Sequence, residues 1–337
     1  MRRILIDKTI EERVREFAEV MKGNRPDLLD WGTGNAPKEK LIAFYKELVK
    51  RADYIEHARY VYTIIILYEN LLVLTPDMMG YVYEAYFKKW DDILTDEVEY
   101  GSKKSFYEQV IGCMGYENIR SGLMRQYMKA QKIKVCVYCN AQPAITTEVF
   151  VENGRKKRIA TYQFDHRMPE SKFPFLCTSY YNLQPSCPTC NQIKRARTAL
   201  FELYTRNKEN LDVFRFELTP EKAVMAYVKE DMDRLEVKLH CDSDMALLEN
   251  HQKLFHVDLI YAEHMDVVKR IIVILRANSG YYRQSLQEGL NSLFDDGVDD
   301  PGYFFFGYYM NKENIHLKPL SKLVQDVVEE IGGDVLR

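Results

Sequence analysis

Four cysteines occur in two pairs that share one spacing. Cys136 and Cys139 form the first Cys-x-x-Cys pair, and Cys187 and Cys190 form the second. Two cysteines at this spacing on a tight turn can direct both sulfurs at one ion, at about 2.3 Å for zinc. Two such pairs can complete a tetrahedral site, so the sequence predicts one structural Zn²⁺ held by four thiolates.

Disulfides and buried free thiols are the alternatives for these cysteines. Residues 1–7 lack the apolar stretch and the small-residue cleavage site of a secretion signal, so we expect a cytoplasmic protein. Thiols stay reduced in the cytoplasm, which disfavours disulfides. The other three cysteines are expected to be buried free thiols: Cys113, Cys177 and Cys241.

Four polar residues lie between or beside the cysteine pairs: Asp165, His166, Asn182 and Asn191. Histidine can take a proton from water near neutral pH, because its ordinary pKa is about 6.5. A carboxylate and an amide oxygen suit a hard divalent ion. Together these groups could hydrolyse a phosphodiester. The alternatives are a loop cap for Asp165, a core histidine, a turn residue for Asn182 and a helix start for Asn191.

The order of these elements resembles the HNH endonuclease family, of the kind with a four-cysteine zinc knuckle. The resemblance covers about 60 residues and implies a ββα-metal (His-Me) finger that hydrolyses DNA with one Mg²⁺ or Mn²⁺ ion. It implies His166 as the base, Asp165 and Asn191 as ion ligands, Asn182 as a brace for the loop that holds His166, and Lys194 as a phosphate contact. Many members have histidine where this chain has Asn191, which leaves the choice of metal open.

Four short stretches also resemble the HNH subunits of Septu-type anti-phage systems. They are residues 138–140, 165–172, 182–187 and 318–321. This resemblance implies an ATPase partner and a role in anti-phage defence. The helical regions on either side of the motif would then be docking surfaces for that partner.

The charge distribution favours a polyanionic partner for the motif region. Residues 131–206 carry twelve Lys or Arg against five Asp or Glu, whereas the whole chain has a net charge of −3. A basic segment of this kind fits contact with DNA. Two other functions stay open: a non-catalytic zinc-finger module that binds nucleic acid or protein, and an RNA nuclease.

The remaining pattern predicts an α+β protein that is predominantly helical, with the finger inserted between helical regions. We expect a helical region over 1–130, the nuclease module over 131–206, and a mixed, then helical, region over 207–337. The apolar run at 60–74 predicts a buried helix and no membrane span, because Thr63, Glu69 and Asn70 interrupt it.

Local patterns place further elements. Helices are expected at 11–21, 38–50, 79–93, 104–116 and 247–275. Strands at 144–151 and 158–164, with the turn signal Asn153-Gly154, predict a hairpin that delivers Asp165 and His166 at its end. A helix over 188–204 would carry Asn191. Residues 223–228 and 235–240 are expected to pair as strands.

Overall fold

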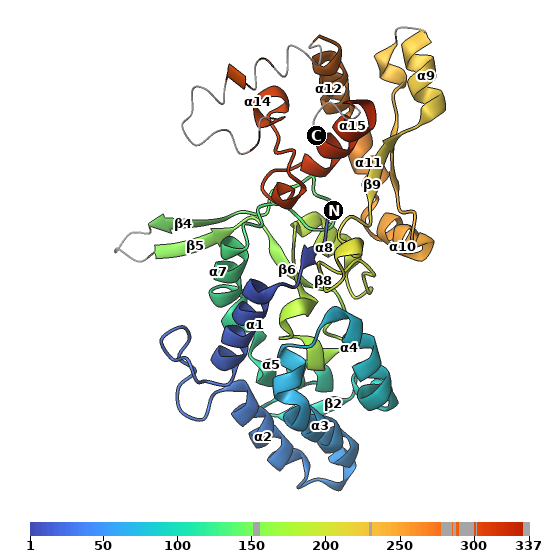
Figure 1. Cartoon of the computed structure of the whole chain (residues 1–337). Helices are drawn as coiled ribbons and strands as arrows, with labels where there is room; N and C mark the ends of the chain where they lie inside the picture. Colours follow the sequence, from blue (N-terminus) through green and yellow to red (C-terminus); the bar gives the residue numbers. More distant parts are fainter. Residues whose placement is uncertain are drawn as a thin grey trace. The chain divides into compact units, whose positions relative to one another are not determined.

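The computed structural model describes residues 1–150, 156–228, 231–277, 285, 288–289, 300 and 302–332 (Figure 1). Helices predominate over these residues, and the strands form small two-stranded sheets, so the predicted α+β class is confirmed. No helix in the described part of the chain is long and apolar enough to cross a membrane.

The chain forms two compact units. One comprises Met1–Arg2, Lys132–Ile145 and Asp212–Arg337, and the other comprises Arg3–Gln131 and Thr146–Leu211. The three regions expected from the sequence are continuous segments, whereas each compact unit combines segments that are separated in the sequence. The three-region division stays a prediction.

Residues 8–72 form the predicted helices of the N-terminal region. They are α1 (Lys8–Met21), α2 (Pro37–Leu48) and α3 (Ile55–Leu72). Helix α3 buries Tyr60, Ile64 and Tyr68, which lie on one face because they are spaced by four residues. The apolar run is therefore a packed helix of the core.

The segment that follows α3 is more broken than the sequence predicts. The expected helix at 79–93 is divided into α4 (Pro76–Val82), a π-helical turn at Tyr83–Phe87 and a 3₁₀ helix at Lys88–Ile93. Trp90 has non-helical backbone angles, and its indole N–H donates to Glu56 at 2.8 Å. This tertiary hydrogen bond accompanies the break in the helix.

The expected helix at 104–116 begins later. Residues Ser102–Ser105 form β3, which pairs with β2 (Glu97–Tyr100), and α5 spans Phe106–Met114. Ser105 and Glu108 form a capping box at its start. The helix ends at Gly115, whose φ of +75° favours glycine. A Cβ there would lie 2.8 Å from the Trp31 ring.

A strand–strand–helix sequence contains the polar residues of the motif. Strand β6 (Gln163–His166) pairs antiparallel with β7 (Leu183–Ser186), with Asp165 opposite Gln184. Helix α8 (Pro188–Lys194) follows directly. Asp165 and His166 are thus the last two residues of a short strand, and Asn191 lies on the helix.

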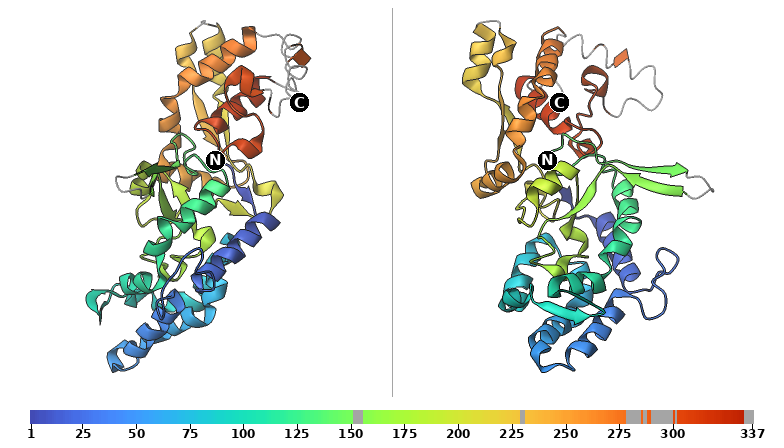
Figure 2. Two further views of the ribbon diagram at one scale, coloured as in Figure 1. Left: turned by 90° about the vertical axis from the view of Figure 1, so that its left-hand side faces the viewer. Right: turned by 180° about the vertical axis from the view of Figure 1, so that it is seen from behind.

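The prediction that the hairpin of strands 144–151 and 158–164 delivers Asp165 and His166 at its end is wrong. Strands β4 (Thr146–Phe150) and β5 (Lys156–Ala160) do pair, but this hairpin extends away from β6 as a separate element (Figures 1 and 2). The turn signal Asn153-Gly154 lies outside the described residues. Because β5 ends at Ala160 and β6 pairs with β7 instead, Asp165 and His166 are held by a long-range pairing.

Helix α8 is also shorter than the predicted 188–204. Arg195 has φ +51°, which ends the helix, and the amide of Arg197 bonds to the carbonyl of Lys194. Strand β8 (Tyr204–Thr205) then pairs in parallel with β1 (Ile4–Leu5). Residues 204–205, predicted to be the end of the helix, are therefore a strand of this sheet.

The C-terminal region differs from expectation in one strand. Residues Pro220–Val228 form helix α9, and β10 (Val237–His240) pairs with β9 (Arg215–Leu218). Pro220 occupies the start of α9, a position where proline is well tolerated. The predicted strand at 235–240 is confirmed, but its predicted partner is wrong.

The expected helix at 247–275 is divided where His256 adopts φ +49°. Its parts are α10 (Met245–Phe255), α11 (Val257–Ala262) and α12 (Met265–Ala277). Helix α15 (Ser321–Gly332) packs on β9 and α12. The short helices α6 (Tyr116–Arg120), α7 (Leu123–Ala130) and α14 (Gly302–Phe306) complete the described helices longer than four residues.

Candidate active site and four-cysteine group

The two cysteine pairs form one group. The sulfurs of Cys136, Cys139, Cys187 and Cys190 all lie within 4.8 Å of one another, and all four residues are buried. None is in a disulfide. Four sulfurs at about 2.3 Å from a tetrahedral zinc would lie about 3.8 Å apart. The group therefore has the donors and nearly the spacing to hold a metal ion such as zinc.

Local hydrogen bonds shape the turn of the first pair. The amide of Cys136 bonds to the carbonyl of Gln142, and the amide of Asn140 bonds to the carbonyl of Cys136, both at 2.9 Å. Asn140 has φ +53°, a conformation that asparagine adopts more readily than most residues. The tight turn directs both sulfurs to one side.

Side chains from α10 and α11 fix the same turn from outside. His251 Nε2 lies 2.8 Å from the carbonyl of Tyr138, and the Tyr261 hydroxyl donates to the carbonyl of Cys139 at 2.8 Å. His251 is fully buried, and burial lowers its pKa to about 3. It is a packing residue of this turn.

The second pair lies at the start of α8. Cys187 is the N-cap residue, and its sulfur accepts from the amide of Cys190 at 3.4 Å. Pro188 occupies the first helical position, where its missing N–H costs nothing. The helix start thus places two sulfurs one turn apart on the same side.

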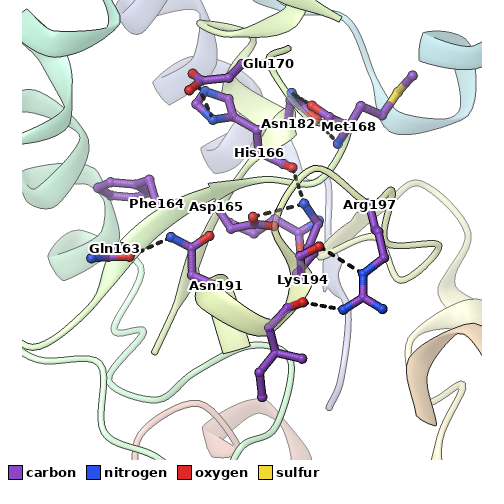
Figure 3. A network of polar contacts seen from close by, with 12 residues as sticks. Gln163, Phe164, Asp165, His166, Met168, Glu170, Asn182, Asn191, Lys194 and Arg197 are labelled. Carbon is purple, nitrogen blue, oxygen red and sulfur yellow. Dashed lines mark hydrogen bonds and ion pairs between the residues drawn. The ribbon is translucent and has the colours of Figure 1, made fainter. Parts of the chain in front are cut away.

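Asp165, His166 and Asn191 line one open pocket of about 640 Å³ (Figure 3). Neighbouring residues on a strand normally face opposite sides. In Figure 3 the imidazole of His166 is directed toward Glu170 and the carboxylate of Asp165 toward Lys194, yet both residues line the same pocket. The structure thus collects three of the predicted site residues.

The imidazole of His166 has a defined tautomer. Its Nε2 lies 2.9 Å from the carbonyl of Cys177, and a carbonyl can only accept, so Nε2 carries the proton. Nδ1 therefore holds the lone pair, at 3.4 Å from Glu170 Oε2. Burial lowers the pKa of His166 to about 4, so the ring is neutral at pH 7.

Asn182 binds the loop that follows His166. Its side-chain oxygen accepts from the amide of Met168 at 2.9 Å, and its amide group donates to the carbonyls of Met168 and Leu176, each at 3.1 Å. Its own carbonyl accepts from the amide of Arg167. These are the contacts that a bracing residue needs.

Lys194 lies behind Asp165, where it is fully buried. Its ammonium donates to Asp165 Oδ1 at 3.0 Å and to the backbone carbonyl of His166 at 2.7 Å. Burial lowers the pKa of Lys194, and the neighbouring Asp165 opposes this shift. In the structure the ammonium contacts Asp165 and the backbone of β6. The contact expected between Lys194 and a substrate phosphate stays a prediction.

Asn191 keeps an oxygen available. Its amide group donates to Gln163 Oε1 at 2.6 Å, and its oxygen lies on the side of Asp165 in Figure 3. One carboxylate and one amide oxygen at an open pocket match Mg²⁺ or Mn²⁺, which keep several waters and take few protein ligands. The donor types of Asp165 and Asn191 therefore fit the predicted ion.

Three residues without a predicted role contact the predicted site residues directly. Glu170 contacts Nδ1 of His166, and burial raises the pKa of Glu170, with Glu117 adding to the shift. Gln163 orients Asn191, and Tyr116 packs on His166 with ring centroids 4.5 Å apart. The sequence could have identified Gln163, because residues two apart on a strand share a face and Gln163 precedes Asp165 by two. It could not have identified Tyr116, which is distant from the motif in sequence.

Comparisons of the chain with family models, with curated proteins and with solved structures found no match.

Proposed function

We propose that this chain is a metal-dependent endonuclease of the HNH type that hydrolyses nucleic-acid phosphodiesters, with DNA as the expected substrate. The observation that carries the proposal is the placement of Asp165, His166 and Asn191 around one open pocket on a strand–strand–helix unit. The four-cysteine group, expected to hold zinc, adjoins the start of the same helix.

The residues of the pocket support a division of roles. Because Nε2 of His166 donates to Cys177, Nδ1 can accept a proton from water. The ring is neutral at pH 7 and can therefore accept a proton, which a protonated imidazole could not. Asn182 keeps the loop after His166 in place, so the imidazole need not reorganise when the substrate binds.

Asp165 and Asn191 would hold the divalent ion from two elements of the unit. When bound, Mg²⁺ or Mn²⁺ would neutralise charge on the phosphate and on the leaving oxygen. Lys194 fixes one oxygen of Asp165 and the backbone next to it. Gln163 holds the amide of Asn191 in the orientation that presents its oxygen.

A nicking assay tests the proposal. Purified protein is incubated with supercoiled plasmid DNA and with a matched RNA, each with added Mg²⁺, with added Mn²⁺ or without either. We expect DNA cleavage that requires the added metal. Cleavage of RNA alone would favour the RNA nuclease, and no cleavage of either substrate would contradict the proposal.

A non-catalytic zinc-finger module is the second candidate. The buried ion pair of Asp165 with Lys194 favours it, because it gives Asp165 a structural role that needs no metal. Such a module would bind nucleic acid or protein with equal affinity in the wild type and in His166→Ala. The nicking assay separates it from the first candidate.

The resemblance to Septu-type subunits leads us to propose an ATPase partner and a role in anti-phage defence. Affinity purification of the chain expressed with its neighbouring genes would test this. Recovery of an ATPase is expected, and cleavage activity that an ATPase neither accompanies nor changes would weaken the proposal.

A further inference from the structure

The wall of the candidate pocket that faces β6 comes from a segment outside the cysteine motif. Residues 107–125 contribute Tyr107, Tyr116, Arg120, Ser121 and Arg125, and the region from 162 to 196 contributes the rest of the lining. The sequence motif covers only the second group. The pocket is therefore built jointly by the N-terminal helices and the strand–strand–helix unit.

A tertiary contact fixes the position of this wall. The hydroxyl of Tyr116 donates to the carbonyl of Phe164 at 3.2 Å, and its ring packs against His166. Tyr116 opens α6, and Arg120 follows four residues later at the end of the same helix. Residues four apart lie on one face of a helix, so the anchor of Tyr116 also directs Arg120 to the pocket.

Positive charge lies on the rim of this pocket. Arg120, Arg125 and Arg195 line it together with two carboxylates, Asp165 and Glu170. Arg120 and Arg195 are exposed and Arg125 is half-buried, whereas Asp165 is buried beside Lys194. A planar guanidinium matches the geometry of a phosphate oxygen pair better than an ammonium does.

We propose that Arg120 and Arg125 form a phosphate-binding wall that holds the sugar–phosphate backbone of a nucleic-acid strand on the 107–125 side of the scissile phosphate. Arg195, at the end of α8, contacts the backbone on the opposite side. This inference rests on the proposed nuclease function and names the part of the chain that binds its substrate. The backbone contact is independent of base sequence.

The alternative is an ordinary solvated ion pair. Arg120 Nη2 lies 2.7 Å from Glu117 Oε2, with both side chains more than half exposed. Exposed pairs of this kind contribute little to stability, so a phosphate can replace Glu117 at small cost. Arg59 on α3 makes the same i, i+3 pair with Glu56 and is likewise exposed, but it is not among the residues that line this pocket. It is a matched control.

Fluorescence anisotropy on the full chain tests the wall. The probes are a labelled single-stranded DNA, its duplex and an RNA of the same sequence, titrated across a salt series. Mg²⁺ and Mn²⁺ are omitted, and no strong chelator is added, because a chelator could remove zinc from the cysteines. The variants are Arg120→Ala, Arg120→Lys, Arg125→Gln and Arg59→Ala.

We expect Arg120→Ala and Arg125→Gln to raise Kd about tenfold and each to reduce the slope of log K against log salt by about 0.7 to 0.9. Arg120→Lys should keep most of the slope, because it keeps the charge. Arg59→Ala should match the wild type. The proposed phosphate-binding wall would be contradicted if Arg120→Ala and Arg59→Ala changed Kd equally. It would also be contradicted if Arg120→Ala and Arg125→Gln both left binding unchanged.

Cleavage is measured in parallel to separate the two proposals. Wild-type protein that binds through Arg120 but cuts nothing with Mg²⁺ or Mn²⁺ would overturn the nuclease function and keep the wall. Protein that cuts DNA while the Arg120→Ala and Arg125→Gln variants bind normally would keep the function and overturn the wall. Thermal unfolding and zinc content of each variant establish that the fold is intact.

Discussion

The ammonium of Lys194 lies 3.0 Å from Oδ1 of Asp165, and the same ammonium bonds to the backbone carbonyl of His166. One buried cation therefore holds both a candidate ion ligand and the main chain of the candidate base. The contact joins the end of α8 to the end of β6, and it gives the unit a fixed geometry at the pocket.

Removing Lys194 should destabilise the protein. Lys194→Met leaves Asp165 buried without its cation, a loss of about 3–5 kcal/mol for a broken buried pair. The double variant Asp165→Asn/Lys194→Met should recover much of that stability but no cleavage, because the ion ligand is lost. Urea unfolding of the singles and the double measures the coupling. Additive losses would show that the pair does not act as a unit.

His166→Ala should abolish cleavage and leave folding and zinc content intact. Removal of a general base lowers rates by about 10²–10⁴-fold. His240→Ala is the control, because His240 is exposed on β10 and does not line the pocket. Single-turnover cleavage of a labelled duplex gives the rates. A His166→Ala rate equal to that of the wild type would remove His166 from the mechanism.

Asn191 should set the affinity for the divalent ion. Asn191→Ala should raise the Mg²⁺ concentration needed for half-maximal cleavage, and Asn191→Asp should lower it, because a carboxylate binds the ion more strongly than an amide does. Gln163→Ala is expected to have a smaller effect in the same direction as Asn191→Ala, since it only orients the amide. Metal titrations of the cleavage rate give these constants. Identical titration curves for all variants would argue against ligation by Asn191.

The cysteine group should bind about one equivalent of zinc. Cys190→Ser is expected to lose the metal and much of the folding free energy, because zinc binding and folding are coupled in such sites. Cys113→Ser is the comparison, since Cys113 is a buried free thiol outside the group. Elemental analysis and thermal unfolding of the purified variants are the measurements. A folded wild type with less than about half an equivalent would contradict the site.

Stability should fall as pH drops below about 6.5. Burial lowers the pKa of His251 and of His316 to about 3, whereas the unfolded chain has the ordinary value of 6.5. Between these values the unfolded state binds more protons, so acid favours unfolding. The stabilisation is complete above pH 6.5 and is lost as pH falls toward 3. Urea midpoints from pH 7.5 to 4.5, with zinc release followed separately, measure the slope.

A substitution separates the histidine contribution from the general effect of acid. His316→Gln removes one buried imidazole that contacts the carbonyl of Arg2 and should flatten the dependence of stability on pH. Parallel slopes for His316→Gln and the wild type would exclude His316 as a source of the effect.

The sequence alone determined the features that depend on local spacing. The two Cys-x-x-Cys pairs predict a four-sulfur group, and the structure gathers those sulfurs within 4.8 Å. The apolar run at 60–74 predicts a buried helix because its length and composition suffice, and α3 spans Ile55–Leu72. The order of Asp165, His166 and Asn191 identifies them as candidate site residues before any contact is known.

Only the tertiary structure decided which strand pairs with β6, what Lys194 binds and which segment walls the pocket. Each of these depends on a contact between residues far apart in sequence: β6 with β7, Lys194 with Asp165, and Tyr116 with Phe164. A basic residue near a helix end looks like a solvated side chain in sequence. Lys194 is buried because the fold brings the carboxylate of Asp165 to it. Local hydrophobic periodicity cannot predict this partner, because the two residues are far apart in sequence.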